Sequence, residues 1–375
     1  MKGTIRLLDF VYVAGVTQSL FFSFLLFKNR KNRYANRFLA MVGITVSLII
    51  GIPLLNQTPI FNYLPFFLLY LICSPLMIAP FIFLYTKFLI SPNLKFKMKD
   101  GIHFLLFLLW FLFISIKYIA VSSPISEFFR TNHMIMGIIM WINIGQTITY
   151  HIYILYILKQ YSRQIKESFS SIEKISLRWL KTMIILGIIF GFFMLLLFTV
   201  DPLITFPKFN AVIWLILAMI VMVFVISYLA IRQPEIFQLS VQEKDLRKKY
   251  QTSGLSPEKA QELKKNLLDL MEREKPFLNN LLNISDLAKK LSVPPWYVSQ
   301  VINEAFNQNY FDFINKFRVE EAQKQLADST KKHLSILEIA YDVGFNSKST
   351  FNTAFKKYLK TTPSHFRRNM SQHSA

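Results

Sequence analysis

The sequence predicts an all-α protein, in which a bundle of seven transmembrane helices precedes two helix-turn-helix units. Composition is the first observation: 53% of the 375 residues are hydrophobic, 37 are Phe, and the mean hydropathy is +0.35. These values are too apolar for an ordinary soluble protein of this length. The second observation is that the long apolar windows all lie before residue 232. The third is a pair of similar helical patterns in the last 90 residues.

Seven apolar windows each approach the ~20 residues that a membrane-spanning helix needs. They are Leu7–Phe27, Phe38–Leu55, Tyr63–Leu84, Ile102–Val121, Met134–Leu158, Leu180–Val200 and Phe209–Ile231. We interpret the first as an uncleaved helix and not as a signal peptide, because no small-x-small cleavage pattern precedes the basic run at Lys28. Pro65, Pro75 and Pro80 are expected either to kink the third span or to be tolerated in it.

The short loops alternate in positive charge. Loops one, three and five hold most of the cations, at Lys28, Arg30, Lys31, Arg33 and Arg37, at Lys87, Lys95, Lys97 and Lys99, and at Lys159, Arg163, Lys166, Lys174, Arg178 and Lys181. Loops 56–62, 122–133 and 201–208 hold only Arg130 and Lys208. Since positive loops stay in the cytoplasm, the N-terminus is predicted outside and the chain after Ile231 inside.

Net charge is distributed unevenly over the chain. Residues 1–231 contain 20 basic and 6 acidic side chains, whereas residues 232–375 contain 23 and 16. Most of the formal charge of +21 therefore belongs to the membrane half, where it accounts for orientation and attraction to anionic headgroups. The C-terminal part is only mildly basic, so a single copy is expected to bind nucleic acid modestly and with strong salt dependence.

One predicted span carries a polar face. Asn143, Gln146, Thr147 and Tyr150 share one side of the fifth span, with His151 beside it. Polar groups in hydrocarbon need partners, so this face should point into the bundle. It serves either as a ligand pocket or relay, or as hydrogen bonds that hold the helices together.

Catalytic chemistry has little support in the sequence. The predicted spans contain few carboxylates, Asp9 and Asp201 lying toward span ends, so a proton relay lacks its usual residues. There is no His-Glu-x-x-His motif and no glycine-rich phosphate loop. Cys73 is the single cysteine, which excludes an intrachain disulfide or a cysteine cluster for zinc. We expect no enzyme activity, metal or cofactor.

The stretch Ser335–Arg368 has the pattern of two short helices joined by a glycine turn. Apolar residues at i, i+3, i+4 and i+7 form the inner face of the first helix, at Ile336, Ile339, Ala340 and Val343. Gly344 then allows a sharp turn. The second helix buries Phe351, Ala354, Phe355 and Tyr358 and leaves a short, polar and basic outer face. That face suits a helix that enters the DNA major groove.

A similar pattern lies about fifty residues upstream. Leu287, Ala288 and Leu291 match the first helix, and Val298, Val301 and Ile302 match the second. Tyr310–Leu326 is predicted as one amphipathic helix between the two units.

Another amphipathic helix is predicted before the two units, at residues 256–275, where Ser256 and Pro257 begin it. Its apolar stripe of Leu263, Leu267, Leu270 and Met271 either docks on the C-terminal domain or pairs with a second copy. Docking is favoured because the helix is short for a coiled coil.

The segment Ile284–Arg368 resembles the DNA-binding domain of the AraC/XylS family of bacterial transcription regulators. The matching residues are Leu287-Ala288, Tyr297, Asn307, Arg318, Ala322, Leu326, Ile339-Ala340, Val343-Gly344-Phe345, Ser349, Phe351, Phe355-Lys356, Pro363 and Arg367. The resemblance implies two helix-turn-helix units joined by a long helix, and the whole layout is similar to a membrane-anchored subgroup of that family. The sequence departs from the family at Asn307 and Lys360, where glycine is usual, and at Pro294, where a serine cap is usual.

Positions on the second helix of each unit are the candidate base contacts. They are Trp296, Tyr297, Ser299, Gln300 and Asn303 in the first unit, and Ser347, Lys348, Thr350, Asn352 and Thr353 in the second, with Lys356 as a phosphate contact. The predicted domains are 1–231 in the membrane as a sensor, 232–283 as a cytoplasmic linker, and 284–375 for DNA binding.

The predicted function is a one-component regulator of the bacterial cytoplasmic membrane that binds promoter DNA. Its expected partners are double-stranded DNA, the lipid bilayer and a small-molecule or membrane signal, with RNA polymerase and a second copy of the chain as further candidates. One alternative is a transporter or membrane enzyme whose fused tail is regulatory. Another is a tethered DNA-binding module that senses no ligand.

Overall fold

The computed structural model describes residues 7–29, 32–91, 93–121, 128, 133–172, 175–200, 211–231 and 255–373. Within these residues the regular elements are all helices, and the only strand-like pairing is an isolated antiparallel bridge between Phe169 and Asn283. The predicted all-α class is therefore confirmed. Most of the outer loops predicted at 122–133 and 201–208, and residues 232–254 of the predicted linker, lie outside the described residues.

The chain divides into two units, which are considered separately. One contains Met1–Leu158 and Arg178–Gln233, and the other contains Lys159–Leu177 and Pro234–Ala375. The second unit thus includes a segment from between the fifth and sixth apolar windows, which the sequence analysis assigned to the membrane domain.

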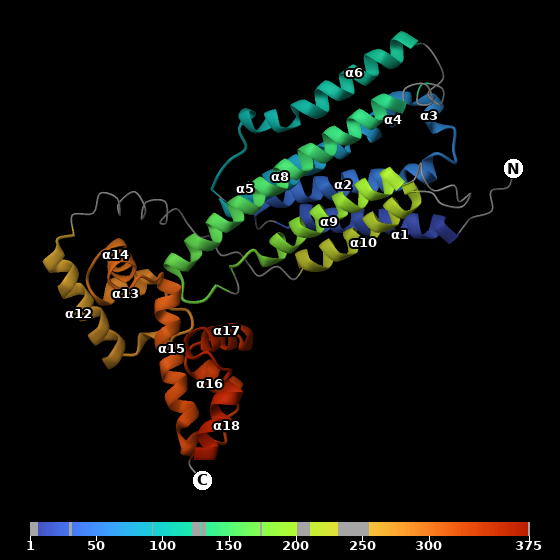
Figure 1. Ribbon diagram of the computed structural model, residues 1–375. Coiled ribbons are helices and arrows are strands. Elements are labelled where there is room, and N and C mark those ends of the chain that lie inside the picture. The colour runs from blue at the N-terminus through green and yellow to red at the C-terminus, as the bar shows by residue number, and fades with distance from the viewer. Residues whose placement is uncertain are drawn as a thin grey trace. The chain divides into compact units, whose positions relative to one another are not determined.

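Apolar helices make up the first unit (Figure 1). They are α1 (Leu7–Lys28), α2 (Arg33–Leu55), α3 (Ile60–Tyr63), α4 (Pro65–Cys73), α5 (Pro75–Ile90), α6 (Leu105–Val121), α8 (His133–Ser168, of which the part up to Leu158 belongs here), α9 (Arg178–Val200) and α10 (Ala211–Ile231). A 3-10 turn, Met98–Phe104, precedes α6.

Four helices among the described residues are long and apolar enough to cross a bilayer, namely α1, α2, Met98–Val121 and Gly137–Ser168. Helices α4 and α5 make a fifth span if they are counted together, since they bend by 50° at Ser74. Of the two alternatives for the proline residues, the structure shows the kink. Helices α9 and α10 cover the last two apolar windows, but the number of seven spans stays a prediction.

Small residues let helices of the first unit approach closely. The Ser19 hydroxyl on α1 donates to the Gly43 carbonyl on α2 at 2.7 Å, and a Cβ at Gly43 would lie 2.2 Å from Ser23 Oγ. A Cβ at Gly15 would lie 2.6 Å from Ile220 on α10. Such contacts are typical of membrane helices, where tight packing replaces the hydrophobic effect as the cause of association.

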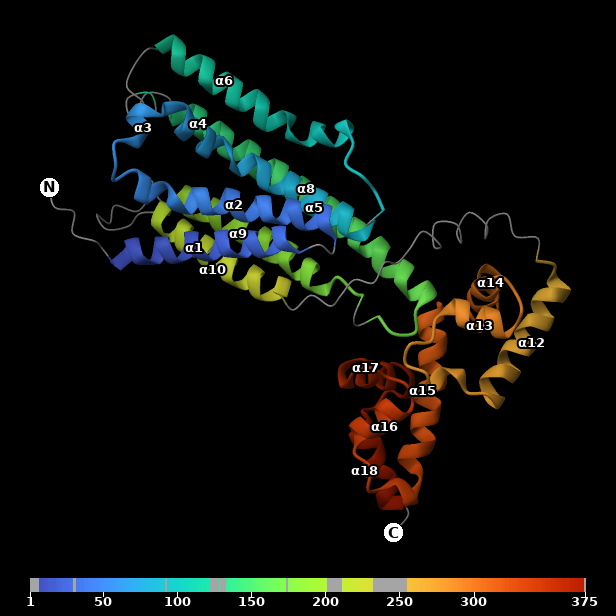
Figure 2. The ribbon, with the colours of Figure 1, turned by 180° about the vertical axis from the view of Figure 1, so that it is seen from behind.

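The second unit contains two helix pairs on either side of a long helix (Figures 1 and 2). Its helices are α12 (Pro257–Arg273), α13 (Ile284–Lys290), α14 (Pro295–Phe306), α15 (Tyr310–Ala327), α16 (Ile336–Asp342), α17 (Lys348–Leu359) and α18 (Pro363–His373). We call α13–α14 the first helix pair and α16–α17 the second helix pair. Helix α15 packs against both pairs.

Each helix pair has its own hydrophobic core. The first core includes Leu287, Val298 and Ile302, and the predicted stripe of α12 enters it through Leu267, Leu270 and Met271. Docking of α12 on the C-terminal domain, favoured by the sequence, is therefore confirmed. The second core contains Ile339, Ala340, Val343, Phe351 and Phe355 together with Val319, Ala322 and Leu326 of α15. Both cores lie within residues 267–366, so residues 255–375 are expected to fold as a fragment.

Several turns among the described residues use left-handed residues that are not glycine, and two of them end the second helix of each pair. Asn307 ends α14 with φ 51°, and Lys360 ends α17 with φ 58°. These are the two positions where the family usually has glycine. A left-handed conformation costs a non-glycine L-residue roughly 1–2 kcal/mol, less for Asn, so Lys360 is the more strained of the two.

Lys360→Gly is expected to stabilise residues 255–375 by about 0.5–1 kcal/mol, because glycine removes the left-handed strain but loses more chain entropy on folding. Lys356→Gly is the matched control. It places the same substitution inside α17 and should destabilise by about 1 kcal/mol. Urea unfolding of both fragments measures the two effects, and a Lys360→Gly fragment that unfolds more easily than the parent would contradict the strain.

Candidate nucleic-acid interface

The turn of the second helix pair depends on Gly344. Its φ is +93°, and a Cβ there would lie 2.6 Å from the carbonyl oxygen of Phe277 and 2.7 Å from that of Leu278. Both the backbone angle and the space therefore require glycine. The next residue, Phe345, folds back as predicted: its N–H donates to the Ala340 carbonyl at 2.9 Å and its side chain is buried.

Capping groups begin both helices of the second helix pair. Ser335 and Glu338 form a capping box at the start of α16. The Ser335 backbone N–H donates to the Glu338 carboxylate and, with the Ser335 hydroxyl, keeps the pKa of Glu338 below its usual value. Ser347 caps α17, accepting from the Thr350 N–H at 3.2 Å. Its hydroxyl is thus already used in folding, which weakens it as a base contact.

The remaining candidate residues of α17 differ in exposure. Lys348, Thr353 and Lys356 are exposed, whereas Thr350 and Asn352 are half-buried. The Thr353 hydroxyl donates to the Ser349 carbonyl within the helix at 2.8 Å. The outer face of α17 therefore presents short polar side chains between two cations, Lys348 and Lys356. Such a face is expected for a helix that reads a groove and contacts phosphate.

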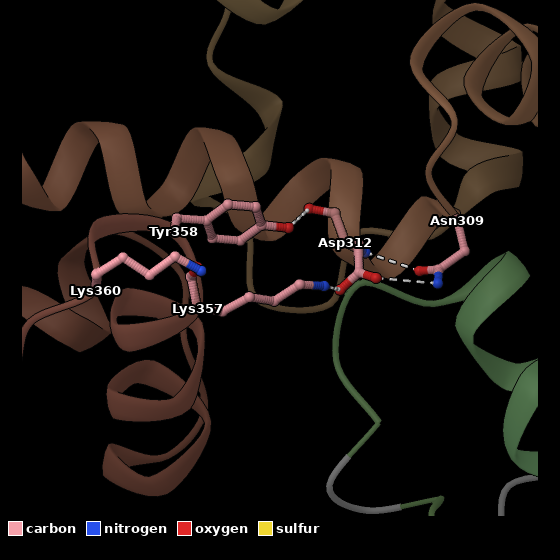
Figure 3. Close-up of polar contacts among 5 residues, drawn as sticks. All are labelled: Asn309, Asp312, Lys357, Tyr358 and Lys360. Atoms are coloured by element: carbon pink, nitrogen blue, oxygen red, sulfur yellow. Dashed lines mark hydrogen bonds and ion pairs between the residues drawn. The ribbon is translucent and has the colours of Figure 1, made fainter.

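A polar anchor holds α17 on α15 (Figure 3). Lys357 Nζ lies 2.7 Å from Asp312 Oδ1, and the Tyr358 hydroxyl donates to the Asp312 carbonyl at 2.8 Å. Asn309 caps α15 by accepting from the Asp312 N–H at 2.9 Å. Burial and the nearby Asp312 and Glu320 raise the pKa of Tyr358, so it remains a neutral donor. The ion pair between Lys357 and Asp312 could not be predicted from the sequence patterns.

The first helix pair begins as the resemblance requires, despite its proline residues. Asn283 caps α13, and α14 starts at Pro295, where the missing N–H costs nothing. Trp296, Tyr297, Ser299, Gln300 and Asn303 are all half-buried. The side chain of Gln300 donates to Glu304 at 3.1 Å, and that of Asn303 donates to Ser299 at 3.3 Å and to Glu167 at 3.2 Å. This surface is less open than that of α17.

The polar residues of α8 in the first unit take part in two separate hydrogen bonds and leave two buried atoms without a partner. The Tyr150 hydroxyl and His103 Nδ1 are 2.7 Å apart, and His151 Nδ1 lies 2.7 Å from the Thr147 carbonyl. His151 is buried, and a Cβ at Gly187 would lie 2.7 Å from its Nε2. Asn143 Nδ2 and Gln146 Oε1 are buried atoms without a hydrogen-bond partner in the structure. No group of three or more His, Cys, Asp or Glu that could hold a metal occurs in the described part of the chain.

Comparison with known proteins locates the C-terminal unit in a family. A helix-turn-helix domain family matches residues 287–369. The probable transcription factor PqrA of Proteus vulgaris is 34% identical over 91 residues, which are 24% of this chain and 72% of PqrA. The chain belongs to the AraC/XylS family of transcription regulators.

A second curated relative agrees with this membership. The regulatory protein SoxS of Escherichia coli strain K12 is 29% identical over 103 residues, 28% of this chain and 94% of SoxS. The C-terminal domain of AraT, a response regulator from Geobacillus stearothermophilus, is 30% identical and covers 31% of this chain and 88% of its own, with a TM-score of 0.25. The family match at residues 287–369 and the alignment with SoxS place the AraC-type part of the chain, a DNA-binding domain, in its C-terminal quarter.

Two lysines of α17 are expected to differ in role. Lys348→Ala should relax base preference at one position, because it removes a donor at the helix N-terminus. Lys356→Ala should weaken binding to all sequences alike and lower the salt slope by about 0.9, the value for one phosphate contact. Binding of residues 255–375 to matched and mismatched duplexes across salt measures both. The charge-matched control is Lys265→Ala, which lies on exposed α12 surface, and identical behaviour of the two α17 variants would contradict the assignment.

Proposed function

We propose that the chain is a one-component transcription regulator embedded in the bacterial cytoplasmic membrane, which binds promoter DNA through both helix pairs while still tethered. The observation that carries this proposal is the second helix pair: a buried core, a glycine turn that no other residue can make, and a recognition helix anchored to α15 through Asp312. Membership of a family of transcription regulators supports the same function.

Reading by two helix pairs is supported by their repeated construction. In each pair a capped short helix precedes a longer helix whose inner face is buried and whose outer face is polar. Since α15 packs against both pairs, it fixes the distance between α14 and α17. Two recognition helices at a fixed spacing can enter successive major-groove segments on one face of DNA.

Seven spans with the N-terminus outside and the C-terminal domain in the cytoplasm complete the proposal. The long apolar helices of the first unit support insertion, and the alternation of cations between loops supports the orientation. A domain that binds chromosomal DNA needs the cytoplasmic side.

We further propose that the membrane bundle senses a signal through α8. The unpaired atoms of Asn143 and Gln146 lie one turn apart on that helix, and a buried polar atom without a partner is costly in hydrocarbon. A small polar ligand that supplies the missing hydrogen bonds would bind one state of the bundle better than another and shift the equilibrium toward it.

Selection from a random DNA pool tests DNA reading. The full chain in lipid nanodiscs and residues 255–375 are each used to select duplexes, and the selected DNA is footprinted. We expect two protected major-groove segments about one helical turn apart, ~34 Å. Binding that depends on salt but not on sequence, in both forms of the protein, would contradict the proposed function.

Cysteine labelling in intact cells tests the orientation. Thr58→Cys and Lys332→Cys are both exposed positions, and the native Cys73 is buried and is replaced by serine in both variants. We expect a membrane-impermeant maleimide to label Thr58→Cys in intact cells and Lys332→Cys only after lysis. Labelling of Lys332→Cys in intact cells would place the C-terminal domain outside and exclude a role in transcription.

A further inference from the structure

A short segment that follows the apolar part of α8 docks on the DNA-binding domain. It comprises Lys166–Ser171, which we call the strap, and belongs to the second unit. Phe169 forms an antiparallel bridge with Asn283, and Ser170 binds the Leu282 carbonyl through both its N–H at 3.3 Å and its hydroxyl at 2.6 Å. Ser170 is 1% exposed, so the strap is inserted into the domain and does not merely lie on its surface.

The strap reaches the guanidinium of Arg318, which is itself 1% exposed. Arg318 donates to the Phe277 carbonyl at 2.7 Å and to the Asn279 carbonyl at 2.9 Å. It also donates to the Ser170 carbonyl at 2.9 Å and to the Ser170 hydroxyl at 3.1 Å. A buried charge is stable only when its donors are satisfied. Two of these acceptors come from the strap, so the strap helps to keep Arg318 buried.

The same strap touches both helix pairs, at a proposed base-reading residue of α14 and just before the start of α17. Its Glu167 carboxylate accepts from the Asn303 side chain on α14 at 3.2 Å. Its Ser171 hydroxyl accepts from the side chain of Asn346, the residue before the cap of α17. Lys166 Nζ lies 5.8 Å from the centre of the Phe311 ring on α15. The strap therefore spans from one recognition helix to the start of the other.

We propose that the strap is an intramolecular competitor of DNA, docked in a site formed by Arg318, Asn303, Asn346 and the backbone of 277–283. This inference rests on the proposed function, since it requires α14 to face DNA. A carboxylate hydrogen-bonded to a base-reading side chain occupies that side chain and repels the phosphates that must approach it. DNA and the docked strap thus exclude each other at α14, and release of the strap switches the domain to its DNA-binding form.

The position of the strap also defines a route for the signal. Helix α8 is continuous from His133 to Ser168, so its last turn carries Lys166 and Glu167. A shift of α8 along or about its axis moves these residues with it, because an α-helix transmits such a shift with little loss. This route uses the non-covalent contact of the strap with the DNA-binding domain. It is separate from the covalent connection through residues 232–254.

Two strap variants test the competition in the full chain in lipid nanodiscs, with the duplex selected in the pool experiment as the probe. Glu167→Gln should lower the dissociation constant about fivefold at low salt, as one unit charge near a phosphate does in water, and by less at high salt. Ser170→Tyr does not fit the buried site and should expel the strap, with a gain in affinity that persists at high salt. Glu272→Gln, an equal charge change at an exposed position of α12, is the control and should leave affinity unchanged.

Hydrogen exchange provides a second measurement that does not depend on any substitution. The Ser170 amide donates to Leu282 and should exchange slowly in the free protein. Saturating selected DNA should raise its exchange rate more than tenfold, whereas a non-selected duplex should not. In Ser170→Tyr the amide of residue 170 should exchange fast with or without DNA.

The outcomes separate this inference from the proposed function. If neither the full chain nor residues 255–375 select a sequence, the proposed function fails. If selection occurs, but both variants match Glu272→Gln or bind more weakly, and the Ser170 amide stays protected on DNA, then the strap is not a competitor. If both variants bind DNA more tightly and the Ser170 amide loses its protection on DNA, the strap is a competitor of DNA.

Discussion

The buried guanidinium of Arg318 is the interaction on which the second unit most depends. The cost of removing a charge from water is large, and here carbonyl and hydroxyl oxygens offset it. Those oxygens belong to parts of the chain that are far apart in sequence, and the ring of Phe345 lies 5.8 Å from the guanidinium carbon. The planar, fixed geometry of the donors therefore positions several segments at once, which a lysine could not do. The turn at Gly344 packs against the same segment, because a side chain there would collide with the Phe277 and Leu278 carbonyls.

Local sequence patterns were sufficient to predict most of the C-terminal unit. Helical periodicity identified the buried faces of α14, α16 and α17, and the glycine turn located the second helix pair, because these features depend on residues only a few positions apart. The left-handed turns at Asn307 and Lys360 followed from the family resemblance, because the family usually has glycine at these positions. What the sequence did not reveal were contacts across long separations. Asp312 with Lys357 and Ser170 with Arg318 are 45 and 148 residues apart, and no pattern in a single sequence records such pairs.

The end of α8 shows the limit of hydropathy as a guide. The apolar window stops at Leu158, but the helix continues to Ser168 through residues such as Lys159, Gln160 and Lys166. These are good helix formers, so the helix has no reason to end where the hydrocarbon does. A window based on hydropathy detects only the part that prefers lipid. The polar extension was therefore interpreted as a loop, and its role in the C-terminal unit was missed. For the polar face of the same helix, the sequence left a ligand pocket and a structural network open. The unpaired atoms of Asn143 and Gln146 fit a ligand pocket, and the contact between Tyr150 and His103 fits a structural network.

The two proposals together constrain how a signal is transmitted. Gln146 and Glu167 belong to different units of the chain, and both lie on helix α8. A mechanical route through one helix needs only that the ligand bind two positions of α8 with different affinity. By reciprocity, DNA that displaces the strap must change the affinity of the bundle for that ligand by the same factor. A ligand that satisfies Asn143 and Gln146 equally well in both positions would bind tightly and yet regulate nothing. The polar face of α8 can therefore act as a sensor only if its hydrogen bonds differ between the docked and released states of the strap.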